Sequence, residues 1–502
     1  MAASCHNQEF PRMIKVLMVA SEAAPFAKTG GLADVVGSLP PALRDFDCEV
    51  AVLIPRYRAV DLSSARRIYD SLPVWLGGVM HHTSLYQADA ATPFYFLEAP
   101  TLYDRDGFYG DEDGDYPDNA VRFAVFSRAA LAVARRVFRP QIIHCHDWQS
   151  GLVPVYLRTV FAYDPTFMGM RTLFTIHNLG YPGLFPPAVL PQVGLDRRVF
   201  SMDGLEFFGR VSFIKGGLNY SDVLSTVSRK YALEIQTPEY GFGLDGVLRA
   251  RSSDLYGILN GVDYGNWNPQ ADPHIAAHFS ADDLSGKRLC KQDLIREFGL
   301  PEAAMNRPLA GVVSRLTPQK GTELIIEILE ALAAEDLYLV ILGSGDAVYA
   351  DALRAAVVAQ ADRIGVRFGY DETLAHKIEA GADMFLMPSQ YEPSGLNQMY
   401  SLRYGTIPVV RATGGLDDTI DEGTGFKFQE YSAQAFLAAI RAAATAYEDR
   451  QGWEAMMRRG MRIDYSWRAS AAEYAALYQR LLDGGKGAAS FGLEKHQTQV
   501  RV

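Results

Sequence analysis

The chain has 502 residues, more than one ordinary hydrophobic core can hold, so two domains of roughly 200–250 residues each are expected. Hydrophobic residues make up 48% and charged residues 21%, an ordinary balance for a soluble globular protein. Every apolar run falls short of the ~20 residues that a membrane span needs. Residues 1–12 also lack the apolar stretch of a signal peptide, so we expect a cytoplasmic protein with no membrane partner.

The net charge of −11 argues against a nucleic-acid partner, because such a partner calls for a basic surface. If a substrate carries phosphates, their positive partners must be local. The cysteines lie far apart and form no CxxC pair, which is typical of reduced intracellular thiols; they are Cys5, Cys48, Cys145 and Cys290.

Short β-branched runs recur along the chain, each followed by a turn signal and a helical pattern. In the first half they cover residues 14–20, 50–54, 141–145, 172–176 and 223–227. In the second half they cover residues 309–314, 337–342, 384–387 and 407–410. Continuous apolar strands that alternate with helices predict a parallel sheet covered on both faces. Two such sets predict an α/β fold of two doubly wound, Rossmann-like domains, whose ligands bind at the carboxyl ends of the strands.

The boundary between the two domains is expected between Asn260 and Pro308, since Asn260-Gly261 is a turn dipeptide and Pro308 precedes a fresh strand. We place the N-terminal domain at residues 13–262 and the C-terminal domain at 263–464. Helical patterning over residues 433–482 is interrupted near 464–466. Residues 465–482 are expected to form a helix that packs back on the N-terminal domain, followed by a disordered tail over 483–502.

A Thr-Gly-Gly-Leu sequence occurs once in each half, within Lys28–Leu32 and at Thr413–Leu416. Each copy follows a predicted strand and opens a helix. Paired glycines such as Gly30-Gly31 and Gly414-Gly415 let backbone N–H groups approach a ligand, and a helix N-terminus favours phosphate. Tight turns that need glycine for geometry alone are the alternative. Occurrence at matching positions in both halves favours ligand binding.

The second half places cations and an acid at strand ends. Arg315 and Lys320 follow strand 309–314 and offer a planar fork of donors and a point charge, the two ways in which side chains hold a diphosphate. Glu392 lies in a Pro/Gly-rich loop beyond strand 384–387, where a carboxylate can meet developing positive charge. Ordinary surface charges and a helix-capping acid are the alternatives.

In the first half, two strand ends carry His144, His146, Asp147 and His177. Such a group invites a zinc interpretation, but no third ligand group with metal spacing appears, so no metal is predicted. Asp147 and His177 are predicted as hydrogen-bonding groups on the floor of the cleft. Three acidic triplets within residues 104–118 lie in a predicted exposed loop and are interpreted as solvated acids. The glycine pattern of an NAD site is broken at Val348, which disfavours an oxidoreductase.

Seven motifs together resemble bacterial glycogen synthases in identity and order. They are KTGGL at 28–32, HDW at 146–148, TIHNL at 175–179, NGVD at 260–263, SRLTPQKG at 314–321, YEPSGL at 391–396 and TGGL at 413–416. The resemblance spans about residues 14–482, and KTGGL near the N-terminus is specific to glycogen and starch synthases. It implies the GT-B fold, a glucan acceptor on the N-terminal side and a nucleotide-sugar donor on the C-terminal side. It further implies ADP-glucose as donor, transfer to the non-reducing end of an α-1,4-glucan, and no cofactor.

The resemblance also assigns residues of the donor site. Lys28 matches a donor contact, Arg315 and Lys320 match a diphosphate clamp, and Tyr370 matches the position that stacks on the nucleobase. A nucleoside diphosphate leaves as a weakly basic anion, so fixed positive charge is needed rather than a protonated acid. These cations and the Gly414-Gly415 amides can supply that charge without a metal.

Three further positions match residues of the reacting centre. Glu392 matches the essential acid, His177 a contact to the transferred sugar, and Asp147 an active-site acid. We expect retention of configuration, with the acceptor's 4-hydroxyl attacking the face that the diphosphate leaves and Glu392 orienting donor hydroxyls. The stretch 419–426 is shorter than in many members, so we expect the local surface there to differ from theirs. Two alternatives stay open: a retaining GT-B transferase that uses a UDP- or GDP-sugar, and a catalytically silent glucan-binding relative.

Overall fold

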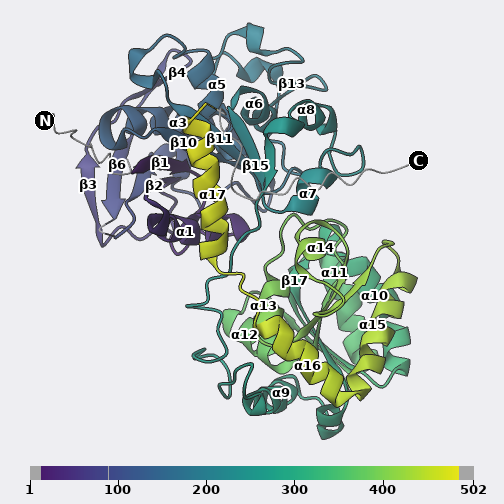
Figure 1. Ribbon diagram of the computed structural model, residues 1–502. Helices are drawn as coiled ribbons and strands as arrows, with labels where there is room; N and C mark the ends of the chain where they lie inside the picture. Colours follow the sequence, from purple (N-terminus) through teal and green to yellow (C-terminus); the bar gives the residue numbers. More distant parts are fainter. Residues whose placement is uncertain (1–12, 89, 485–502) are drawn as a thin grey trace, which may run out of the picture.

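The computed structural model describes residues 13–88 and 90–484, arranged as two α/β units (Figure 1). The predicted extension at residues 1–12, Cys5 and the tail from residue 485 onward lie outside these described residues. Each unit is built on a largely parallel sheet, so the predicted fold class is confirmed. Every β-branched run expected from the sequence coincides with one of the strands.

The sheet of the first unit has the order β16-β15-β11-β10-β1-β2-β7-β6-β3. Its strands from β16 to β7 are parallel, and β6 and β3 complete one edge in antiparallel pairing. The strand bounds are β1 Ile14–Val19, β2 Cys48–Pro55, β3 Ala65–Tyr69, β6 Ser84–Ala88, β7 Phe94–Glu98, β10 Ile142–His146, β11 Arg171–Ile176, β15 Val223–Thr226 and β16 Leu255–Gly257.

Helices and small hairpins surround this sheet. The helices are α1 Gly31–Leu43, α2 Pro100–Tyr103, α3 Asn119–Val133, α4 Asp147–Ser150, α5 Leu152–Arg158, α6 Phe213–Tyr220, α7 Arg229–Glu234 and α8 Asp245–Ala250. The small sheets consist of β4 Val74–Leu76 with β5 Val79–His81, β8 Gly110–Asp111 with β9 Gly114–Asp115, and β12 Leu184–Phe185 with β13 Glu206–Phe207 and β14 Arg210–Ser212.

The second unit has a fully parallel sheet in the order β19-β18-β17-β20-β21-β22. Its strands are β17 Leu309–Leu316, β18 Tyr338–Gly345, β19 Ile364–Phe368, β20 Met384–Met387, β21 Ile407–Arg411 and β22 Phe426–Phe428. Its helices are α9 Ser285–Phe298, α10 Thr322–Ala334, α11 Ala347–Ala359, α12 Glu372–Gly381, α13 Asn397–Arg403, α14 Gly414–Thr419, α15 Ala433–Glu448 and α16 Arg450–Met461. Two separate hydrophobic clusters pack against its strands, as expected for a sheet covered on both faces.

The last helix, α17 (Trp467–Leu482), leaves the second unit and lies on the first, where it contacts α1 (Figure 1). Its apolar face, including Trp467 and Tyr474, belongs to the core of the first unit. The chain therefore passes between the units twice, and the two passages are tied together where the backbone N–H of Val262 donates to the carbonyl of Tyr465 over 2.7 Å. No helix within residues 13–88 and 90–484 is long and apolar enough to cross a membrane.

Candidate active site

A cavity of about 680 Å³ is lined by residues of both units. Its walls come from segments that follow the carboxyl ends of β1, β10 and β11 in the first unit and of β17, β18, β19 and β20 in the second. This is where a doubly wound sheet presents its loops to a ligand. Most of the predicted site residues line it: Lys28, Gly30, Gly31, Asp147, His177, Arg315, Lys320, Tyr370 and Glu392.

The buried carboxylate of Glu22 anchors the loop that carries Lys28. Glu22 accepts hydrogen bonds from the backbone N–H of Thr29 over 2.5 Å and from its hydroxyl over 2.7 Å. The Tyr109 hydroxyl donates to the same carboxylate over 2.5 Å. Lys28 itself is exposed, and its ammonium pairs with Asp34 of α1 at 2.8 Å. The loop is thus fixed while its cation stays accessible from the cavity.

Glu392 and Lys320 form an ion pair, with Nζ 2.5 Å from Oε2. The carboxylate is buried, and the Ser389 hydroxyl donates to it over 3.0 Å. The loop after β17, which carries Lys320, approaches the loop after β20, which carries Glu392. This approach depends on Gly321, which adopts φ +68°; a Cβ there would stand 2.1 Å from the Pro388 carbonyl oxygen. Glycine is therefore required at 321 to bring the cation to the acid.

Asp147 and His177 lie together at the ends of β10 and β11. An oxygen of Asp147 accepts from the backbone N–H of His177 over 2.7 Å, and Asp147 itself has φ +53°. Burial raises the pKa of Asp147 to about 7, although the N–H groups of His177 and Asn178 lower it. Burial lowers the pKa of His177 to about 3, so its imidazole is neutral near pH 7.

Comparison with known proteins gives matches over most of the chain. Residues 15–250 match the starch synthase catalytic domain family, and residues 297–459 match the glycosyl transferases group 1 family. The glycogen synthase of Koribacter versatilis is 50% identical over 474 residues, covering 93% of this chain and 98% of that protein. That of Anaeromyxobacter dehalogenans is 51% identical over 478 residues, covering 93% and 100%.

A solved structure supports the same family. The catalytic domain of starch synthase IV from Arabidopsis thaliana, bound to ADP and acarbose, has a TM-score of 0.85 to this chain at 34% identity and covers 94% of this chain and 100% of that one. This chain belongs to the glycogen synthase family. The resemblance read from the seven motifs and the GT-B fold are thereby confirmed, and the chain is a glycosyltransferase of the starch and glycogen synthase type.

Two further predicted donor residues of this glycogen synthase family member are open to the cavity. Tyr370 lies in the turn between β19 and α12 with 79% of its surface exposed, so a face of its ring is accessible. Arg315 stands at the end of β17, also exposed, with a long 3.5 Å contact to Gln319. Within the described residues, the side-chain hydrogen bonds of both are long, at 3.5 Å from Arg315 to Gln319 and 3.4 Å from Tyr370 to Glu372.

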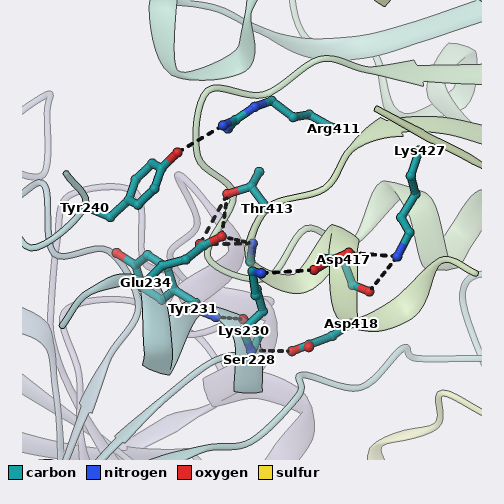
Figure 2. Close-up of polar contacts among 11 residues, drawn as sticks. Ser228, Lys230, Tyr231, Glu234, Tyr240, Arg411, Thr413, Asp417, Asp418 and Lys427 are labelled. Carbon is teal, nitrogen blue, oxygen red and sulfur yellow. Dashed lines mark hydrogen bonds and ion pairs between the residues drawn. The ribbon is translucent and has the colours of Figure 1, made fainter. Parts of the chain in front are cut away.

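The second Thr-Gly-Gly-Leu loop is placed differently from the first. Residues 413–416 are absent from the described residues that line the cavity, and Leu416 is buried in the core of the second unit. The hydroxyl of Thr413 and the backbone N–H of Gly414 both donate to Glu234 of α7, at 3.1 Å and 3.0 Å (Figure 2). Burial raises the pKa of Glu234, while the Gly414 N–H lowers it. The amide expected to face a phosphate thus faces a carboxylate in this conformation.

Several residues that line the cavity have no role predicted from the sequence, although some of them lie within the seven motifs. The turn Ser394–Leu396 ahead of α13 lines the cavity next to Glu392, and its position between an acid and a helix start was a signal for it. Glu22 and Asn178 also line it, but a single acid or amide near a strand end carries no distinctive spacing.

Part of the acidic segment also reaches the site. Asp104 and Asp106 pair with Arg58 on the surface, as expected of solvated acids. Asp115, on β9, is exposed yet lies among the residues that line the cavity.

Proposed function

We propose that this chain transfers glucose from ADP-glucose to the non-reducing end of an α-1,4-glucan with retention of configuration, the activity of a glycogen synthase (EC 2.4.1.21). The observation that supports it most is the meeting of Lys28 from one unit with the Lys320–Glu392 pair of the other around one cavity. The related starch synthase was solved with ADP and acarbose, a nucleotide and a glucan-like sugar, which fits the same pair of substrates.

The donor is proposed to lie with its diphosphate toward Arg315 and Lys320, its base on Tyr370 and its sugar toward His177 and Glu392. Fixed cations in a partly desolvated cavity stabilise the charge that develops on the leaving diphosphate. Lys320 is paired with Glu392, so an arriving phosphate shares this cation with the acid.

The acceptor's 4-hydroxyl then attacks C1 of glucose as the C1–O bond to the phosphate breaks. The departing phosphate oxygen takes the hydroxyl proton, so no separate base is required. Glu392 is proposed to orient donor hydroxyls and to stabilise the positive charge at C1. Asp147 supports the sugar site through the backbone N–H of His177. The cytoplasmic location and the absence of a metal requirement remain predictions from the sequence.

One assay tests the proposal directly. The purified protein is incubated with glycogen and either radiolabelled ADP-glucose or radiolabelled UDP-glucose, with and without EDTA. We expect label in polymer from ADP-glucose, undiminished by EDTA and released as maltose by β-amylase, which cleaves α-1,4 bonds from non-reducing ends. Preferential use of UDP-glucose would reject the donor assignment, and strict Mn²⁺ dependence would implicate the acidic segment that contains Asp115.

A further inference from the structure

A buried row of polar side chains lies on one face of the first sheet. It consists of His144, His146, Thr175 and His177, together with Tyr478 of α17. Side chains two residues apart on a strand point to the same face, so His144 and His146 of β10 share a face. His146 is the register partner of Thr175 in β11, which places Thr175 and His177 on that face as well. Only one member of this row, His177, is among the residues that line the cavity.

Two hydrogen-bonded groups make up the row, and the rings of His144 and His146 join them with their centroids 4.1 Å apart. Nδ1 of His146 lies 3.0 Å from Nε2 of His177, and both side chains are buried. His144 bonds through its ring nitrogens to the hydroxyls of Tyr478 and Thr175, at 2.8 Å and 2.6 Å. Tyr478 belongs to α17, so the row runs from α17 to the cavity.

The His146–His177 contact limits where the protons can be. Burial lowers the pKa of both imidazoles, so each ring carries one N–H and one bare nitrogen, and one ring must donate to the other. Nε2 of His146 is buried and has no hydrogen-bond partner among the described residues. If His177 donated, this Nε2 would be a buried N–H without an acceptor, and orphaned N–H groups are the rarer defect. If His146 donates from Nδ1, only a bare nitrogen is left unpaired.

The geometry points to the second arrangement. We propose that His146 is a positioning residue that donates from Nδ1 to Nε2 of His177, so that His177 carries its own proton on Nδ1 and presents this N–H to the transferred sugar. His177 lines the cavity, and within the described residues the hydrogen bond of its ring is the Nε2 contact to His146, so Nδ1 is left for a ligand. The kinetic part of this inference rests on the proposed function, but the proton assignment does not.

Spectroscopy tests the proton assignment. In protein labelled with ¹⁵N-histidine, long-range ¹H–¹⁵N correlations separate protonated from bare ring nitrogens, and the signals that vanish in His177→Ala identify His177. We expect a protonated Nδ1 and a bare Nε2 in the wild-type protein, and a mixture of tautomers in His146→Phe. A protonated Nε2 in the wild type would overturn the proposal.

Kinetics test the consequence. His146→Phe removes the donor but keeps a ring, and we expect kcat to fall about tenfold, the scale of one buried hydrogen bond, with KM for ADP-glucose nearly unchanged. His146→Asn places an amide N–H close to the position of Nδ1, so it should retain most of the activity. Equal losses in the Phe and Asn variants would reject the hydrogen bond as the cause.

A double-mutant cycle separates positioning from general damage. If His146 acts through His177, His146→Phe should cause no further loss of kcat in a His177→Ala background. An additive loss would contradict the proposal. Tyr478→Phe is the matched control: it removes one buried hydroxyl of the same row, and it should leave kcat and the His177 spectrum unchanged. A wild-type protein that transfers no glucose from ADP-glucose would reject the proposed function, while the spectrum would still decide the tautomer.

Discussion

At the residue scale, the site combines charges that the sequence places far apart. Lys320 and Glu392 are 72 positions apart and form a contact of 2.5 Å in which the carboxylate is buried and the ammonium half-buried. Removing one member of such a pair leaves an uncompensated buried charge. The acid and the cation therefore form one electrostatic unit, and in the proposed function a diphosphate shares its cation.

Replacing Glu392 by Ala is expected to lower kcat by about 10²–10³, the scale for losing one preorganised electrostatic group. Steady-state kinetics with ADP-glucose and glycogen measure this loss. Glu330→Ala, an exposed acid on α10, is the control and should leave kcat unchanged. Turnover close to wild type in the Glu392 variant would refute its proposed role.

Asp147 should make stability depend on pH. Its pKa rises from 3.8 to about 7 on folding, so between these values the folded state holds a proton that the unfolded state has released. The contribution of Asp147 to the free energy of unfolding is therefore greatest at low pH. It falls by at most about 4 kcal/mol as the pH rises toward 7. Thermal unfolding between pH 4 and 8 should show wild type losing stability relative to Asp147→Asn as the pH rises. A constant difference between the two proteins would contradict the shift.

At the element scale, helix α17 is part of a domain to which it is not adjacent in sequence. Six of its residues belong to the core of the first unit: Trp467, Ala471, Tyr474, Leu477, Tyr478 and Leu481. A stripe at helical spacing predicts a buried face, but it carries no information on which sheet that face covers. The break between α15 and α16 was not predicted, because Asp449 is a single capping residue whose side chain accepts from the Gly452 N–H.

Leu477→Ala should destabilise the first unit by about 2–5 kcal/mol, the range for emptying a buried leucine site. Urea unfolding followed by far-UV circular dichroism measures the change. Gln479→Ala, on the exposed face of the same helix, should stay within about 0.5 kcal/mol of wild type. Equal effects of the two substitutions would mean that α17 does not contribute to that core.

At the scale of the whole molecule, the two units touch through α7 and α14 (Figure 2). Glu234 of α7 accepts from the Gly414 N–H at the start of α14, and Asp418 of α14 accepts from the Lys230 N–H over 2.9 Å. Arg411 donates to the Tyr240 hydroxyl over 3.0 Å beside them. Each helix thus receives an acid from the other unit at its N-terminal end, where backbone N–H groups lack partners. The same loop donates from the Gly415 N–H to the Glu392 carbonyl, so the contact adjoins the active site.

Glu234→Ala should weaken this contact by about 1–3 kcal/mol, because it leaves the buried Gly414 N–H without an acceptor. Small-angle X-ray scattering should then show a larger radius of gyration for the ligand-free variant. Glu234→Gln keeps an acceptor and should be intermediate, and the exposed Glu448→Ala should match wild type. An unchanged radius in Glu234→Ala would show that other contacts hold the units together.

The sequence by itself determined the parallel parts of the two sheets, the central strands and most of the polar groups around the cavity. These features follow from local patterns: apolar runs predict buried strands, and polar groups after them gather at one sheet edge. Short edge strands such as β16 and β22, of three residues each, are too brief for such a pattern.

Only the tertiary structure decided which groups meet. It paired Lys320 with Glu392, placed Glu234 on the amide of Gly414 from 180 positions away, and put His146 beneath His177. The reason is physical: periodicity reports whether a side chain is buried, whereas its partner depends on how distant segments pack. The two Thr-Gly-Gly-Leu loops illustrate this, since Thr29–Leu32 line the cavity, whereas Thr413 and Gly414 of the second loop donate to Glu234 of the other unit.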